Sequence, residues 1–308
     1  MRCKRCGRDA NVHIRAHNIA LCAEDFLSFL ERRVSETTRK YGLISKGQRA
    51  LVCVSGGKDS LSLWYILNNI GIEADGFHIH LGIGAYSDKS LSKVEQMAER
   101  LARKVHVTFL QKTLGQGIAE LAKRLKRQTC SLCGTLKRYL MNRVAIEKDY
   151  DVLVLGHNLD DEASALLGNI LYWRKEYLWR KHISLEGIEG HLAKKVKPLF
   201  LISEREMASY AFLRGIDYVT DECPYAAGAK TLLYKELLNR VEEESPGTKI
   251  RFVMGYLAQA GRDGEKRERQ FCKLCGYPSY AERCVVCRIL ERFGTGRPVA
   301  FEVYPRTG

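Results

Sequence analysis

Eleven cysteines carry much of the chemistry that this 308-residue chain can perform, and eight of them stand in Cys-x-x-Cys pairs. Two thiolates three residues apart on a tight turn can bind one metal ion, whereas structural disulfides are rare in a reducing cytoplasm. The C-terminal set consists of Cys272, Cys275, Cys284 and Cys287. Two pairs separated by eight residues are typical of a closed, tetrahedral zinc site, so we expect a structural zinc ribbon here.

The N-terminal cysteines form a second set with three thiolates. These residues are Cys3, Cys6 and Cys22. Asp25 stands where a second Cys-x-x-Cys pair would place its last cysteine. Because zinc accepts carboxylate and imidazole ligands as well as thiolates, the fourth ligand is Asp25, His13 or His17. The spacing favours Asp25.

Three further cysteines, a pair and a distant single residue, lie in the middle of the chain. Cys130 and Cys133 form a pair, and Cys223 precedes Pro224 much later. Three thiolates leave one coordination position open, which suits a catalytic metal or an iron–sulfur cluster with one free iron. A redox-active pair with a third thiol is the alternative. Cys53 lies in an apolar run and has the character of a buried strand residue.

A glycine-rich segment, Ser55-Gly56-Gly57-Lys58-Asp59-Ser60, follows the apolar run that ends at Val54. Glycines allow the backbone to approach a ligand, and the free N–H groups at the start of a helix bind phosphate. A Walker A loop would have serine or threonine after its lysine, and here that residue is Asp59. The segment therefore predicts a different kind of phosphate-binding loop.

Strands and helices alternate around this loop. We expect strands at 49–54, 73–80, 105–110 and 152–155. We expect helices at 25–41, from 58, at 87–104, at 130–148 and from about 160. This rhythm predicts an α/β fold with a parallel sheet, helices on both faces and ligands at the carboxyl ends of the strands. Helices at 204–213 and 231–244 follow, and the charged segment 262–269 is the best candidate for a linker.

The predicted organisation therefore has five parts. They are an N-terminal zinc finger at 1–27, a linking helix at 28–48, a nucleotide-binding catalytic domain at 49–220, a helical extension with the third central cysteine at 221–268, and a zinc ribbon at 269–308.

The charge balance favours a nucleic-acid partner. Fifty Lys and Arg against 36 Asp and Glu give a net charge of +14, which attracts a phosphate backbone. Basic and aromatic clusters that suit RNA occur at 123–127, 172–179 and 194–197. The longest apolar runs are much shorter than a membrane span, and the N-terminus lacks an apolar signal sequence, so we expect a cytoplasmic protein without a membrane partner.

Several of these motifs together resemble a known family. Ser-Gly-Gly-x-Asp-Ser resembles the PP-loop of the adenine-nucleotide alpha-hydrolase superfamily, whose members cleave ATP between the α- and β-phosphates. Gly156-His157-Asn158-Leu159-Asp160-Asp161-Glu162 is similar to a second element of that superfamily. Together with the cysteine trio, Lys137 and both zinc modules, these motifs resemble the tRNA 2-thiouridine synthetases of the TtuA type over essentially the whole chain.

The resemblance implies an ATP-dependent tRNA sulfurtransferase that adenylates the C2 oxygen of the T-loop ribothymidine and replaces it by sulfur without net redox change. It implies a 4Fe-4S cluster on Cys130, Cys133 and Cys223, and catalytic roles for Asp59, Lys137 and Asp161, with Mg²⁺ at the phosphates. Lys137 is one helical turn from Cys133, so both can face one cavity. The implied ATP contacts are Cys53, Ser55, Gly56, Gly57, Lys58, Asp59, Ser60, Ile79, Gly156 and Asp161.

The implied partners are tRNA, a ubiquitin-like sulfur carrier with a C-terminal thiocarboxylate, and a second copy of the chain in a homodimer. Thiolation of the anticodon wobble uridine by the same mechanism is the nearest alternative. A redox pair at Cys130 and Cys133 without a cluster is another, and a non-catalytic zinc-ribbon RNA-binding protein is a third. Of His78 and His80, we expect at most one to face the nucleotide.

Overall fold

A twisted seven-stranded sheet forms the centre of the computed structural model, which describes residues 1–179, 182–225, 230–259, 270–296 and 299–304. The strand order is β11-β5-β4-β3-β6-β8-β7. The bounds are β3 Ala50–Cys53, β4 Ala74–His80, β5 Val105–Phe109, β6 Val152–Leu155, β7 Ser184–Leu185, β8 Lys194–Val196 and β11 Glu302–Tyr304. Five strands are parallel, and the edge strands β7 and β11 are antiparallel. The predicted α/β fold is confirmed.

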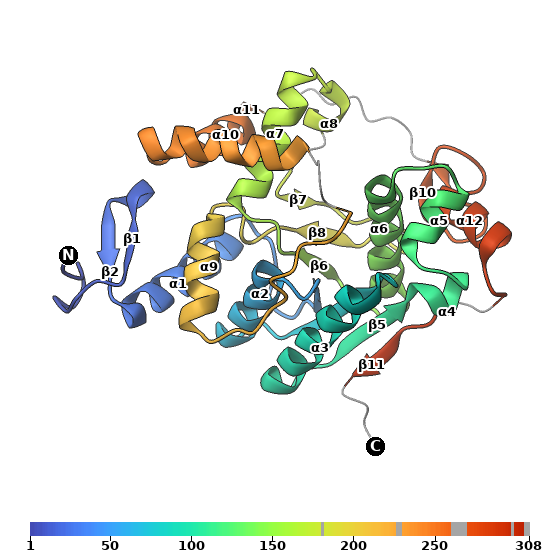
Figure 1. Ribbon diagram of the computed structural model, residues 1–308, viewed down its shortest axis with the longest axis horizontal. Coiled ribbons are helices and arrows are strands. Elements are labelled where there is room, and N and C mark those ends of the chain that lie inside the picture. Colours follow the sequence, from blue (N-terminus) through green and yellow to red (C-terminus); the bar gives the residue numbers. More distant parts are fainter. Residues whose placement is uncertain (180–181, 226–229, 260–269, 297–298, 305–308) are drawn as a thin grey trace.

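Helices cover both faces of this sheet (Figure 1). On one face lie α1 Ala23–Lys40, α2 Lys58–Asn69, α3 Gly84–Leu101 and α9 Glu204–Leu213. On the other lie α4 Leu110–Leu114, α5 Ile118–Arg124, α6 Thr129–Glu147 and α12 Val285–Phe293. Strand alternation produces the two cores, since Val52 faces the first and Leu51 faces the second.

The strand order reverses between β3 and β6. From β3 the chain proceeds outward to β4 and β5, and from β6 it proceeds in the opposite direction to β8. Cys53 at the end of β3 lies beside Leu155 at the end of β6. The loops that follow these two strands therefore diverge from a switch point, the place where open α/β sheets bind ligands.

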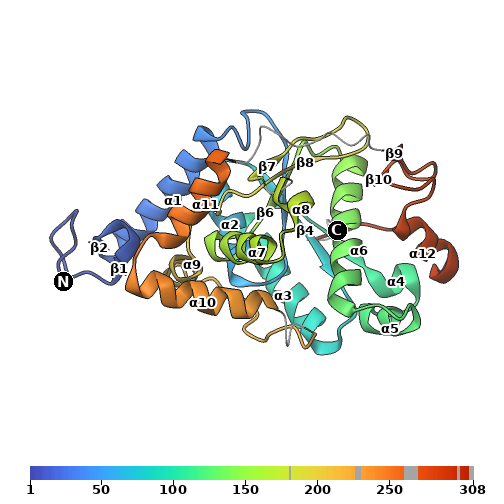
Figure 2. The same cartoon turned by 90° about the horizontal axis from the view of Figure 1, so that it is seen from above.

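A helical layer closes one end of the sheet. It contains α7 Leu159–Leu171, α8 Lys175–Trp179, α10 Lys230–Glu244 and α11 Thr248–Gln259. Figure 2 shows α10 and α11 between the N-terminal module and α7. Their contact with α7 buries Leu159, Ala163, Leu238 and Val253. The extension is therefore packed against the helix that begins at the switch point.

The terminal modules are small. The N-terminal module contains the hairpin of β1 Val12–Ile14 and β2 Ile19–Leu21, which the short 3-10 helix Arg15–His17 connects. The C-terminal module contains the hairpin of β9 Gln270–Phe271 and β10 Pro278–Ser279, followed by α12. None of the described helices is long and apolar enough to cross a bilayer.

The element bounds agree with the sequence prediction at β6, at α9 and at the start of α2, and the other predicted elements differ from it by a few residues or less. Helix α1 runs from Ala23 to Lys40, close to the predicted helix at 25–41, and it begins before the predicted linking part at 28–48. Helix α3 ends at Leu101 because Ala102 adopts the left-handed conformation. Beyond the ribbon hairpin, β11 joins the central sheet beside β5. The predicted linker at 262–269 lies outside the described residues.

Candidate functional site

The glycine-rich loop joins β3 to α2 at the switch point. Gly56 has φ +84°, and a Cβ there would lie 2.8 Å from the carbonyl oxygen of Ser90, so glycine is required. Ser60 Oγ accepts a hydrogen bond from the Ser55 amide at 3.1 Å and donates one to the Gly57 carbonyl at 3.1 Å. Because no side chain caps α2, its first N–H groups can bind an anion.

The loop between β6 and α7 lies directly against this first loop. A Cβ on Gly156 would approach Ser60 Cα at 3.0 Å, so a larger residue would separate the two loops. Asn158 caps α7, and its side chain and that of Asp161 exchange hydrogen bonds with each other's backbone N–H. This capping box fixes Asp161 in place with one carboxylate oxygen, Oδ1, turned to another partner.

Three carboxylates and two lysines meet where the loops converge. Lys58 Nζ lies 3.1 Å from Asp59 Oδ2 and 2.8 Å from Glu204 Oε1. Lys235 Nζ lies 2.7 Å from Asp161 Oδ1 and 3.0 Å from Glu204 Oε2. Glu204 therefore joins the two lysines. Local sequence patterns indicate no role for Glu204 or Lys235, since each lies on a helix far along the chain from the PP-loop.

Burial and charge act in opposite directions on these groups. Burial raises the pKa of Asp59, Lys58 opposes this effect, and the charges of Asp161 and Glu204 add to it. Burial also raises the pKa of Glu204, but hydrogen bonds from Lys58 and Lys235 outweigh it and lower the value to about 2. Asp59 Oδ1 is buried and has no hydrogen-bond partner. An acceptor oxygen of this kind can take a metal ion or a donor from a ligand.

A cavity beside the loop brings several predicted residues together. Cys53, Ser55, Ile79 and Lys137 all line it, as does His78. Burial lowers the pKa of His78 to about 4, so its ring is neutral at pH 7 and its Nδ1–H donates to the Val54 carbonyl at 2.9 Å. His80 instead contacts Asp88 at 2.9 Å. Cys53, expected from its apolar run to be a buried strand residue, thus borders the cavity.

The central cysteine trio lies close to this cavity. Cys130 and Cys133 are in the first turns of α6, and Cys130 Sγ donates to the carbonyl of Tyr225, two residues beyond Cys223, at 3.0 Å. Burial raises the pKa of the Cys133 thiol, Lys137 lowers it, and the charges of Cys223 and Cys130 raise it further. Lys137 and the other two thiols therefore lie within electrostatic reach of Cys133.

The terminal sets gather their ligand atoms more tightly. In each set, four such atoms lie within 4.8 Å of one another. Asp25 Oδ2 is 3.1 Å from Cys3 Sγ and 3.2 Å from Cys22 Sγ, which favours Asp25 over both histidines. In the ribbon, burial raises the pKa of Cys272, but N–H groups including that of Cys284 outweigh burial and lower it to about 6. These donors fit four-coordinate zinc.

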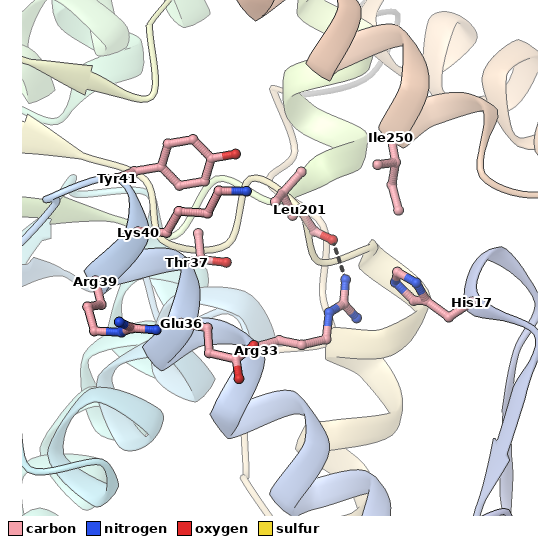
Figure 3. A pocket seen from close by; sticks show the side chains of 9 residues that line it. All are labelled: His17, Arg33, Glu36, Thr37, Arg39, Lys40, Tyr41, Leu201 and Ile250. Carbon is pink, nitrogen blue, oxygen red and sulfur yellow. Dashed lines mark hydrogen bonds between the residues drawn. The ribbon is translucent and has the colours of Figure 1, made fainter.

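A separate cavity of about 450 Å³ lies between the N-terminal module, α1 and α11 (Figure 3). Its lining is His17, Arg33, Glu36, Thr37, Arg39, Lys40, Tyr41, Leu201 and Ile250. Arg33 Nη2 donates to the Leu201 carbonyl at 2.7 Å, and the same guanidinium pairs with Glu206 on α9. The contact ties α1 to the helix whose first residue is Glu204.

The basic clusters predicted for RNA differ in exposure. Trp173 is 75% exposed beside Tyr172 and Tyr177, and Lys230 Nζ lies 2.5 Å from the Tyr172 hydroxyl. In the 194–197 cluster, by contrast, burial lowers the pKa of Lys195, and Lys197 pairs with Glu162 at 3.0 Å. The aromatic cluster is accessible to a partner, whereas lysines of the 194–197 cluster are buried or paired within the protein.

Comparisons with known proteins identify the family of this chain. A PP-loop domain model matches residues 27–227, and the model of the N-terminal LIM domain of 2-thiouridine synthetase TtuA matches residues 2–27. The tRNA-5-methyluridine(54) 2-sulfurtransferase of Thermus thermophilus is 44% identical over 94% of the chain and 91% of its own length. This chain belongs to the TtuA family. The family expected from the sequence is confirmed.

Further relatives of this TtuA-family chain include two kinds of tRNA thiolase. The tRNA-5-methyluridine(54) 2-sulfurtransferase of Pyrococcus horikoshii is 42% identical over 98% of the chain and 97% of its own length. The U34-tRNA thiolase NcsA from Methanococcus maripaludis, solved with its [4Fe-4S] cluster, is 28% identical, with a TM-score of 0.82 over 98% of this chain and 99% of its own.

Proposed function

We propose that this TtuA-family chain is a tRNA sulfurtransferase that uses ATP to replace the C2 oxygen of 5-methyluridine 54 by sulfur. The observation that carries the proposal is the convergence, at the carboxyl ends of the central strands, of the PP-loop, Asp161 and a cavity lined by Lys137 near the cysteine trio. Relatives named for position 54 are 41–44% identical, whereas the NcsA relatives are 28–31% identical. This difference favours the T-loop over the wobble uridine.

Activation of the uridine requires a better leaving group at C2. The C2 oxygen attacks the α-phosphorus of ATP, the bond from this phosphorus to the bridging oxygen breaks, and pyrophosphate leaves with the electron pair. The N–H groups at the start of α2 and the ammonium of Lys58 lie where they can stabilise the charge that develops on pyrophosphate. Attack of sulfur on C2 then releases AMP with the original oxygen.

Two groups absent from the chain itself complete the proposed site. Asp59 and Asp161 would hold Mg²⁺, for which the unpartnered Asp59 Oδ1 is suited. Cys130, Cys133 and Cys223 would hold a 4Fe-4S cluster, whose unligated iron supplies an open position for exogenous sulfur. Lys137 lines the cavity and lowers the pKa of Cys133, so it is placed to orient the uridine or the incoming sulfur.

The proposed partners follow from the same chemistry. They are tRNA, a ubiquitin-like carrier that delivers sulfur as a C-terminal thiocarboxylate, and a second copy of the chain, in the cytoplasm. The net charge of +14 and the exposed ring of Trp173 support the RNA partner.

Mass spectrometry of tRNA nucleosides tests the function. Anaerobically purified protein with a reconstituted cluster is incubated with tRNA, ATP, Mg²⁺ and sulfide, and the modified position is mapped. We expect 2-thiolated 5-methyluridine at position 54 and none with Lys137→Met, while Lys46→Met, at an exposed lysine outside the predicted basic clusters, retains activity. Thiolation at position 34 would move the chain to the wobble branch. Absence of thiolation with cluster and ATP bound would contradict the proposal and favour a non-catalytic RNA-binding role.

A further inference from the structure

Lys235 comes from the helical extension but reaches the convergence of the two catalytic loops. It lies on α10, whose neighbouring residues Tyr234 and Leu238 are buried, so the helix is firmly packed. Its side chain is 23% exposed, and Nζ contacts Asp161 Oδ1 and Glu204 Oε2. A lysine side chain held between two carboxylates is a cation at neutral pH.

The arrangement of charges is symmetrical about Glu204. One of its oxygens accepts from Lys58 and the other from Lys235. Lys58 also contacts Asp59, and Lys235 contacts Asp161. The two lysines thus occupy equivalent places, each joined to Glu204 and to one of the aspartates that would hold Mg²⁺.

Binding of a metal nucleotide would exchange the partners of these groups. Mg²⁺ prefers carboxylate and phosphate oxygens, while lysine binds phosphate as a point charge. Once Asp59 and Asp161 face a metal ion, the two ammonium groups lose these counter-charges and are available to phosphate oxygens. Lys58, at the start of α2, lies at the anion site of the PP-loop. Lys235 then provides a second cation on the side of Asp161.

We propose that Lys235 is a second phosphate-binding lysine of this site, which binds the β- or γ-phosphate of ATP and holds pyrophosphate as the bond to the α-phosphate breaks. The proposal rests on the proposed function, since it assumes that ATP binds at the PP-loop. Glu204 is a positioning residue that keeps the two lysines side by side. The extension that carries Cys223 and α10 thereby contributes directly to nucleotide binding.

Calorimetric titration of the full chain without tRNA measures this contact directly. The probes are AMP and an α,β-methylene analogue of ATP, each with Mg²⁺. Lys235→Met keeps the length of the side chain and removes its charge. We expect about a tenfold or greater loss of affinity for the ATP analogue, as for loss of a charge-assisted hydrogen bond, and unchanged affinity for AMP.

Two further variants separate binding from folding. Lys235→Arg retains the charge and should recover most of the affinity for the ATP analogue. Arg240→Met removes an exposed charge of α10 that pairs only with the nearby Glu236 among its ion pairs in the described structure, and it should change neither affinity. An equal loss for AMP and the ATP analogue, or no loss at all, would overturn the proposal.

Turnover with tRNA distinguishes this result from failure of the proposed function. If the wild-type protein binds the ATP analogue but does not thiolate tRNA, the proposed function fails while the titration still decides the role of Lys235. If the wild-type protein thiolates tRNA and Lys235→Met has an unchanged KM for ATP and an unchanged rate of pyrophosphate release, the phosphate contact is refuted and the function stands.

Discussion

The terminal ligand sets and the central cysteine trio are assembled in different ways. Each terminal set lies within one small module and places four ligand atoms within 4.8 Å. The trio joins the start of α6 to a segment beyond α9 and is not among the sets gathered this closely in the described residues. A closed set of four ligands suits a structural ion, whereas three thiols near a cavity leave room for a reactant. We therefore expect the terminal sets to stabilise the fold and the central trio to take part in the reaction.

The strongest test of this comparison is Cys133→Ser. We expect loss of bound iron and of tRNA thiolation, with a melting temperature close to that of the wild-type apoprotein, because the thiol is near the cavity and does not close a structural site. Iron analysis, nucleoside mass spectrometry and calorimetry measure the three effects. Retained thiolation would remove the trio from the reaction and favour another route for sulfur.

Cys284→Ser should give the opposite pattern in the ribbon. Zinc content should fall by about one ion per chain and the melting temperature should decrease, because structural zinc contributes binding free energy to folding. Hydrogen exchange should show lost protection in α12, whose first residue follows Cys284. Unchanged exchange and melting with the zinc absent would mean that the ribbon folds without metal.

Asp25→Ala is a milder test at the N-terminal set. Chelator competition should show zinc affinity reduced by more than the roughly 10- to 100-fold loss typical of outer-shell partners, since the carboxylate is placed as a direct ligand. Asp25→His should retain zinc, and His13→Ala should have no effect. Equal affinity in Asp25→Ala and the wild type would exclude the carboxylate as a ligand.

The smallest expected effect is on the alkylation of apoprotein thiols. Burial raises the pKa of Cys133 above the 9.0 of an ordinary thiol, so iodoacetamide should label the exposed Cys130 before Cys133. Labelling of Cys133 should increase with pH, because the thiolate forms only as pH rises through the raised pKa. Lys137→Met should slow it further, since the lysine lowers this pKa. Peptide mass spectrometry would show the order, and faster labelling of Cys133 in the variant would contradict it.

Local patterns predicted the parts of the molecule that a short segment determines. The PP-loop and the terminal ligand sets follow from residue types at fixed spacing, and α9 follows from its helical periodicity after the capping residue Ser203. Contacts between segments that are distant in the sequence leave no comparable spacing or periodicity, so they could not be predicted. In the sequence, Lys235 is one of several charged residues of α10 and has no distinguishing feature. Only the packing of α10 against α7 brings its side chain to Asp161. The cavity in Figure 3 likewise depends on three separate elements.

The pairing of β11 with β5 has a consequence for solubility. An uncovered edge strand offers unpaired backbone groups to other chains and promotes aggregation. Glu302, Val303 and Tyr304 pair with β5, so an antiparallel strand of three residues takes the place of the five-residue β5 at this edge of the sheet. Lys112 forms an ion pair with Glu302 across this edge. Because very short edge strands offer few backbone groups to other chains, this strand disfavours intermolecular β-pairing, a role distinct from metal binding and catalysis.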